Sequence, residues 1–189
     1  DSPYLSYLEK ISKQTDRLAN LINDLLDISK IAAGKLIYEK EIIDLDECIR
    51  STIEDFQQTI STHEIVLTGS FKRKFLGDAN RLSQVLINLL SNAVKYSPQK
   101  TKVLVNLTET KDSFSISVID YGMGIPKNSV TKIFERFYRD ESMENGNFPG
   151  LGIGLYISQQ IAKAHGGEIV VESSKNRGSQ FTLILPKTS

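Results

Sequence analysis

The chain has 189 residues, enough for one well-packed domain with an appendage or for two small domains. Its 23 basic and 23 acidic residues cancel, so we expect no overall basic field for nucleic acid or an anionic membrane, and any phosphate binding must be local. The single cysteine, Cys48, excludes an intrachain disulfide and a multi-cysteine zinc site, and no apolar run resembles a membrane span or a secretory signal. We expect these residues to be cytoplasmic and to touch neither membrane nor nucleic acid, which leaves open a membrane anchor in a longer parent protein.

The first segment predicts a long amphipathic helix. Ser2 and Pro3 are typical of an N-cap and a first helical residue, and Gly34 is predicted to end the helix. Two rows of apolar residues make a stripe wider than a coiled-coil seam, as in a helix bundle. One helix cannot bury such a stripe alone, so we expect a partner helix from another chain or from sequence outside these residues. The rows are Leu8, Ile11, Leu18, Ile22 and Leu25, and Leu21, Leu25, Ile28 and Ala32.

The remaining sequence alternates strand and helix patterns, which predicts an α+β fold. We expect a two-layer α/β sandwich, in which about three helices cover one face of a mixed, mostly antiparallel sheet, preceded by the long N-terminal helix. The expected elements are a strand from Lys35 to Ile43, a helix opened by an Asp44–Glu47 capping box, strands at 64–69 and near Phe75, a helix from Asp78 to about Tyr96, paired strands at 102–108 and 113–119, a loop from Asp120 to Pro149, a helix at 152–164, and strands at 168–172 and 181–185.

A polar edge runs along the helix expected at 78–96. Asn88, Asn92 and Lys95 stack at helical spacing beside an apolar arc. Carboxamide oxygens can ligate Mg²⁺ without neutralising it, and a lysine one turn away can meet phosphates. By itself the pattern also fits an ordinary amphipathic helix with a polar shoulder.

A second motif, Asp120-Tyr-Gly122-Met-Gly124-Ile125-Pro126, follows an apolar strand. A carboxylate there can accept a hydrogen bond from an exocyclic amino group such as that of adenine, and the glycines allow a flat base to approach the backbone. An ordinary turn with an aspartate cap is the alternative.

A third motif, Gly150-Leu-Gly152-Ile-Gly154-Leu155, opens a predicted helix, where bare backbone amides suit phosphates. Its G-x-G-x-G spacing and the preceding Asn-Phe-Pro do not match a dinucleotide-binding fingerprint, and the chain contains no P-loop sequence. Between the second and third motifs, Arg136 and Arg139 lie three residues apart on what we interpret as a short helix, where they either reach phosphates or face solvent. The polar stretch from Asp140 to Pro149 is interpreted as a mobile lid.

These four blocks resemble, in this order and over roughly residues 35–187, the N, D, F and second glycine boxes of the histidine-kinase catalytic domain. That domain belongs to an ATPase superfamily shared with DNA gyrase, MutL and heat-shock chaperones. Residues 16–36 resemble the second helix of the kinase dimerisation and phosphotransfer hairpin. The resemblance implies a hairpin helix at 1–34, whose first helix is absent from these residues, and an ATP-binding catalytic domain at 35–189.

The resemblance also implies roles for the motif residues. Asn88 and Asn92 would hold Mg²⁺, Asp120 would bind the adenine amino group, and Tyr96 would pack beside the nucleotide. Asn88, Lys95, Arg136 and Arg139 would form the catalytic group that faces the phosphates. The other ATP contacts implied are Gly122, Gly124, Ile125, Gly150, Leu151, Gly152, Ile153, Gly154 and Leu155.

Within that superfamily, gyrase-like members carry a water-activating glutamate one turn before the metal-binding asparagine, at the position of Asn88 here. Asn88 cannot act as a base, which favours phosphoryl transfer to a side chain over hydrolysis. Neither His63 nor His165 lies in an acceptor motif, and His165, before two glycines at a helix end, is better explained as a capping residue. The acceptor histidine is therefore expected outside this chain, on the first hairpin helix of the same parent protein.

The expected function is transfer of the ATP γ-phosphoryl group to that histidine, and then to an aspartate in the receiver domain of a response regulator. The parent is expected to dimerise through the N-terminal helix. Two alternatives remain: an ATP-hydrolysing clamp of the gyrase or chaperone type, and a degenerate module that mediates nucleotide binding or dimerisation.

Overall fold

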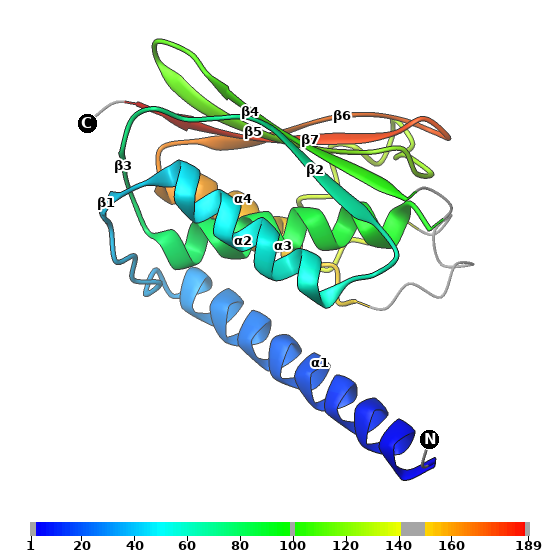
Figure 1. Ribbon diagram of the computed structural model, residues 1–189. Coiled ribbons are helices and arrows are strands. Elements are labelled where there is room, and N and C mark those ends of the chain that lie inside the picture. Colours follow the sequence, from blue (N-terminus) through cyan, green and yellow to red (C-terminus); the bar gives the residue numbers. More distant parts are fainter. Residues whose placement is uncertain (1–2, 99–100, 141–149, 188–189) are drawn as a thin grey trace. The chain divides into compact units, whose positions relative to one another are not determined.

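The computed structural model describes residues 3–98, 101–140 and 150–187 of a chain that forms two compact units, residues 1–37 and 38–189 (Figure 1). Helix α1 (Pro3–Ala32) makes up most of the first unit and begins at the predicted proline, whereas the predicted N-cap Ser2 lies outside the described residues. The helix ends as predicted, because Gly34 adopts a φ of +64° and Lys35 N donates to Lys30 O at 2.8 Å. The apolar row from Leu8 to Leu25 is solvent-exposed within these 189 residues, with exposed fractions of 47–62%.

The described strands of the second unit form one mixed sheet of five strands, in the order β2-β4-β5-β7-β6, and a separate antiparallel pair, β1 and β3. Strands β2 and β4 are parallel, and every other neighbouring pair is antiparallel, so the predicted mixed, mostly antiparallel sheet is confirmed. The bounds are β1 (Glu41–Ile43), β2 (Glu64–Gly69), β3 (Phe75–Gly77), β4 (Lys102–Glu109), β5 (Ser113–Asp120), β6 (Glu168–Ser174) and β7 (Gly178–Pro186).

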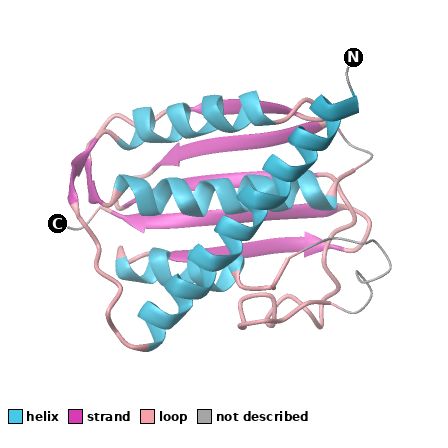
Figure 2. Cartoon of the chain, turned by 90° about the horizontal axis from the view of Figure 1, so that it is seen from below, coloured by secondary structure: helices cyan, strands magenta, loops and turns pink. Residues whose placement is uncertain are grey.

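Helices α2 (Leu45–Thr59), α3 (Ala79–Tyr96) and α4 (Gly154–Ala164) cover one face of this sheet (Figures 1 and 2). The α+β sandwich expected from the sequence is therefore confirmed. Alternate residues of β4 and β5 are buried, as the two-residue period of a half-covered sheet requires. They pack with the apolar sides of the helices to make the core. Its members include Val103, Val105, Phe114, Ile116, Leu82, Leu86, Leu89, Ile157 and Ile161.

Two aspartate caps determine where helices begin. The Asp44 carboxylate accepts from Glu47 N at 3.1 Å, and the Asp78 carboxylate accepts from Arg81 N at 3.1 Å. Each bond satisfies an amide that the first helical turn leaves without a partner, which is typically worth about 1 kcal/mol. Asp78 thereby fixes the start of α3, the helix that carries the predicted polar edge.

Strands β6 and β7 extend beyond the predicted 168–172 and 181–185, and three other elements differ from the sequence prediction. The strand expected from Lys35 begins only at Glu41, because its partner β3 offers three residues for pairing. Helix α4 begins at Gly154 rather than residue 152, since Gly152 has a φ of +71° and cannot continue a helix. The segment around Arg136 forms consecutive turns rather than a short helix.

Candidate functional site

The polar edge of α3 borders the core as the sequence predicts. All six residues of the apolar arc are buried, whereas Asn88, Asn92 and Lys95 are half-buried along the adjoining side of the helix. The three side chains therefore lie where the helix surface meets other segments of the fold. The buried arc comprises Leu82, Val85, Leu86, Leu89, Leu90 and Ala93.

Asn88 contacts the first turns of α4. Its Nδ2 donates to Ser158 Oγ at 2.9 Å, which leaves Oδ1 as the acceptor atom of the carboxamide. A Cβ on Gly154 would clash with this oxygen, so a side chain at position 154 would displace Asn88. The first and third motifs are thereby brought into direct contact.

The second motif begins with a buried carboxylate at the end of β5. Asp120 is 5% exposed and accepts a hydrogen bond from Gly122 N at 2.8 Å. Burial raises the pKa of Asp120, and the backbone amides of Gly122 and Ser179 partly oppose that rise by bonding to the carboxylate. A buried acceptor is thus held at the C-terminal end of the central strand of the sheet.

The glycines after Asp120 fit against the end of α3. A Cβ on Gly122 would clash with the carbonyl oxygen of Tyr96, and Met123 N donates to the same oxygen at 3.1 Å. Tyr96 itself is half-buried, and Lys95 Nζ lies 4.8 Å from its ring centroid. The loop after β5 and the end of α3 consequently form one surface.

The same loop is fixed from its other side by the β6–β7 hairpin. Ile125 is buried, and its N–H donates to Ser173 Oγ at 2.8 Å, while Asn176 N donates to Met123 O at 2.6 Å. Gly124 has a φ of +67° and lies against Ser174 O. Ser173 thus holds the loop, although nothing in the sequence around Ser173 indicates that role.

The third motif extends from Lys95 to the start of α4. A Cβ on Gly150 would be 3.4 Å from Lys95 Nζ, so this end of the loop lies beside the lysine. Ile153 is buried and acts as the N-cap residue of α4. Leu151 is exposed and Leu155 is half-buried.

The arginine-bearing segment contacts this loop through its backbone. Phe137 N donates to Gly152 O at 3.0 Å, and Phe137 has a φ of +64°, an uncommon conformation for a bulky residue. Arg136 and Arg139 are exposed, and the Arg136 guanidinium carbon lies 5.4 Å from the Tyr156 ring centroid. Apart from Asp140, the predicted lid lies outside the described residues.

The structure therefore brings the second and third motifs against the polar edge of α3, and the arginine-bearing segment against the third motif and α4. Sequence reasoning missed the residues that connect them, namely Ser158, Tyr156 and Ser173. Ser158 is 70 positions from Asn88, and no local pattern connects residues at such a separation.

The carboxamide oxygens of Asn88 and Asn92 on α3 are suitable ligands for a magnesium ion. The carboxamide oxygen of Asn88 is available as an acceptor, and no hydrogen bond of Asn92 is found among residues 3–98, 101–140 and 150–187. Neutral carboxamide oxygens are hard ligands, and they would leave the charge of the ion for phosphate oxygens.

The two histidines have structural partners. His165 Nε2 accepts from Asp78 N at 3.0 Å, and Nδ1 donates to Ile161 O at 2.8 Å, which defines a neutral ring at the end of α4. Burial lowers the pKa of His165. His63 is also buried, and its ring nitrogens contact Thr62 and Ser97.

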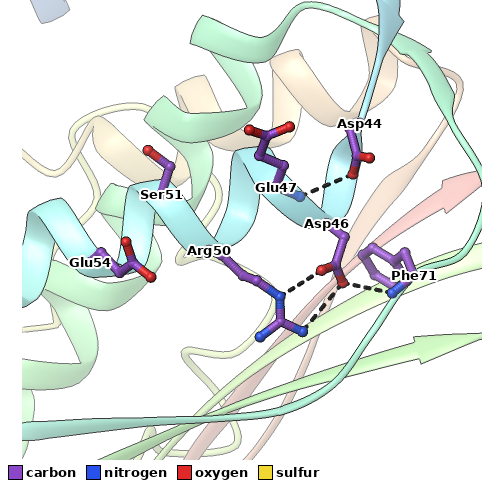
Figure 3. A pocket seen from close by; sticks show the side chains of 7 residues that line it. All are labelled: Asp44, Asp46, Glu47, Arg50, Ser51, Glu54 and Phe71. Atoms are coloured by element: carbon purple, nitrogen blue, oxygen red, sulfur yellow. Dashed lines mark hydrogen bonds and ion pairs between the residues drawn. The ribbon is translucent and has the colours of Figure 1, made fainter.

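A shallow hollow lies at the start of α2 and is lined by none of the predicted nucleotide contacts. Asp46 pairs with Arg50 at 2.5 Å and accepts from Phe71 N at 2.7 Å (Figure 3). Burial alone would raise the pKa of Asp46, but these two hydrogen bonds lower it. These contacts of Asp46 attach the loop at Phe71 to α2. The lining residues are Asp44, Asp46, Glu47, Arg50, Ser51, Glu54 and Phe71.

An α+β sandwich whose glycine-bearing loops converge on a polar helix edge defines a class of nucleotide-binding domain, and comparison with known proteins agrees. The family model described as "Histidine kinase-, DNA gyrase B-, and HSP90-like ATPase" matches residues 77–189. The chain belongs to this ATPase family.

The chain is similar to several sensor histidine kinases. The chain is 34% identical over 184 residues to the sensor histidine kinase WalK of Bacillus subtilis, a match that covers 95% of this chain and 30% of WalK. The mycobacterial sensor histidine kinase MprB is 29% identical, with a TM-score of 0.67, over 78% of this chain and 97% of the MprB chain. Full-length ShkA, solved in complex with AMPPNP, is 24% identical; it shares the fold over 100% of this chain and 40% of its own, with a TM-score of 0.78.

The chain spans less than half the length of the curated relatives it matches, for example 25% of CikA of Synechococcus elongatus and 48% of SenX3 of Mycolicibacterium smegmatis. Among the described residues, no helix is both long enough and apolar enough to cross a membrane.

Proposed function

We propose that this chain is the ATP-binding, phosphoryl-donating part of a sensor histidine kinase, and that it transfers the γ-phosphoryl group of ATP to a histidine outside these 189 residues. The observation that carries the proposal is the convergence of the second motif and the start of α4 on the polar edge of α3, through the Met123 N to Tyr96 O bond and the Asn88–Ser158 bond. Membership of the ATPase family supports the nucleotide, and similarity to sensor histidine kinases supports the reaction.

The adenine is proposed to bind at the end of β5. The buried Asp120 carboxylate can accept a hydrogen bond from the exocyclic amino group, and Tyr96 can pack beside the base. Gly122 and Gly124 keep that surface flat. Ile125 is proposed to support the same loop.

The triphosphate is proposed to lie between α3 and the loop before α4. Lys95 approaches Gly150, and the start of α4 offers backbone amides at the positive end of a helix dipole. Asn88 and Asn92 would hold Mg²⁺, which when bound neutralises part of the phosphate charge. The positive side chains of Lys95, Arg136 and Arg139 would face the phosphates. The loop that would surround the phosphates consists of Gly150, Leu151, Gly152, Ile153, Gly154 and Leu155.

The proposed reaction requires positioning more than acid–base chemistry. A nitrogen of the acceptor imidazole forms a bond to the γ-phosphorus, the bond to the bridging oxygen breaks, and ADP leaves. Asn88 supports transfer over hydrolysis, because a carboxamide hydrogen-bonded to Ser158 cannot remove a proton from water.

The rest of the pathway is proposed from the similarity to sensor histidine kinases. Residues 1–34 would be the second helix of a dimerisation and phosphotransfer hairpin, and residues 35–189 the catalytic domain. The exposed apolar row of α1 supports this assignment, because it requires a partner helix. A homodimeric, cytoplasmic kinase would then pass the phosphoryl group to the receiver domain of a response regulator.

The test mixes this chain with Mg²⁺, γ-labelled ATP and the separately expressed upstream segment of its parent protein. We expect label on the segment that is lost in acid, as phosphohistidine requires, and no label when the acceptor histidine is replaced by glutamine. Free phosphate should form much more slowly than labelled segment.

The control is the same reaction without the acceptor segment. Rapid phosphate release there would favour the ATP-hydrolysing clamp, and failure to bind ATP at millimolar concentration would favour a degenerate module. Either outcome would contradict the proposed function.

A further inference from the structure

Arg136 is held beside α4 by contacts that its own sequence motif does not supply. Its guanidinium carbon lies 5.4 Å from the ring centroid of Tyr156, the third residue of α4. The neighbouring Phe137 N–H donates to Gly152 O at 3.0 Å, so the backbone beside the arginine is attached to the loop that opens the same helix. Two independent contacts therefore bring an exposed cation to the start of α4.

The contact with Tyr156 leaves the hydrogen-bond donors of Arg136 available. An aromatic face attracts the charge of a guanidinium and accepts none of its conventional hydrogen bonds. Among the described residues, Arg136 has no carboxylate partner within ion-pair distance. A cation placed in this way retains its N–H groups for an anionic oxygen.

The position of the pair favours phosphate as that anion. Tyr156 lies two residues after Gly154, the glycine that contacts Asn88, and it is half-buried, which restricts its ring. The first turn of α4 also offers backbone amides and the positive end of a helix dipole. A negative ligand at this end of α4 would meet both the helix and the arginine.

We infer that Tyr156 is a positioning residue, which holds the Arg136 guanidinium toward the phosphates of the nucleotide. The inference rests on the proposed function, because it assumes that ATP binds at the start of α4. Tyr156 need not touch the nucleotide. It acts through Arg136 and restricts the orientations that the exposed arginine would otherwise adopt.

The test measures binding of AMPPNP with Mg²⁺ to the 189-residue chain by calorimetry. Tyr156→Leu removes the aromatic face and should weaken binding about three- to tenfold, the range of a partly exposed cation–π contact. Tyr156→Phe keeps the face and should bind within about twofold of the wild type. This rescue separates the ring from the hydroxyl group.

A double-mutant cycle separates positioning from a merely structural role. Arg136→Ala should weaken AMPPNP binding by itself, and adding Tyr156→Leu should weaken it no further. Wild-type affinity in Tyr156→Leu, full additivity in the double variant, or equal damage from Tyr156→Phe would overturn the inference. If the wild-type chain failed to bind AMPPNP, the proposed function would fail too, whereas the other outcomes remove this inference alone.

Discussion

Asp120→Asn should remove adenine recognition while leaving the fold in place. The carboxylate offers two oxygens, and the backbone amides of Gly122 and Ser179 already bond to it. An asparagine has one acceptor oxygen, so its NH₂ group must face either a backbone N–H or the adenine amino group, and one donor loses its acceptor.

The loss of AMPPNP affinity can be estimated from the free energy of the hydrogen bond that is removed. Hydrogen bonds to a charged partner contribute about 1.5–3 kcal/mol, which predicts AMPPNP binding roughly 10- to 150-fold weaker in the variant. Stability at neutral pH should change by no more than about 1 kcal/mol, because neutralising a buried carboxylate relieves desolvation and offsets the lost backbone bond.

Calorimetry with AMPPNP and with its guanine counterpart is the assay. The guanine base presents an oxygen where adenine has its amino group, and the asparagine NH₂ can donate to that oxygen, so the preference for adenine should fall. Asp112→Asn, an exposed aspartate in the β4–β5 turn, is the matched control and should bind like the wild type. A folded Asp120→Asn protein with undiminished AMPPNP affinity would refute the adenine assignment.

Three further predictions concern packing, metal binding and pH. Gly122→Ala places a Cβ against the Tyr96 carbonyl and should lower the free energy of unfolding by about 1–3 kcal/mol in urea titrations; an unchanged midpoint would contradict the close approach. Ser158→Ala removes the bond that orients Asn88 and should raise the Mg²⁺ concentration for half-maximal AMPPNP binding about 10-fold, and an identical Mg²⁺ titration would count against the metal assignment. Burial lowers the pKa of His165 below its ordinary 6.5, so the unfolded chain takes up a proton first and stability should fall as pH drops below about 6.5. His165→Gln should flatten that part of the stability curve, and an unchanged slope would show that another group titrates.

Much of the fold could be predicted because its signals are local. Asp44 was predicted as a cap and accepts the expected amide of Glu47, and the helix expected from Asp78 does begin there, where the Asp78 carboxylate accepts from Arg81 N. The alternation in β4 and β5 matched a sheet covered on one face. The polar edge of α3 followed from helical spacing alone.

The sequence predictions were wrong where contacts with distant segments determine the backbone conformation. The turn around Phe137 was predicted as a helix, but its N–H bonds to Gly152 O, 15 positions away, and its φ of +64° prevents a regular helix. The strand expected from Lys35 begins only at Glu41, because β3 offers only three residues to pair with. Tyr38, predicted within that strand, instead lies edge-on against the His165 ring, with centroids 5.8 Å apart.

The sequence by itself determined the elements, the class of fold and the residue types that the candidate site contains, because periodicity and capping depend on neighbours within one or two turns. Only the tertiary structure decided which of these residues meet. Asn88 reaches Ser158, the end of α3 meets the loop after Asp120, and Arg136 lies over Tyr156, since packing α3 and α4 on one face of the sheet brings together side chains that are far apart along the chain. Contacts of this kind depend on how the core packs, which cannot be predicted from local sequence patterns.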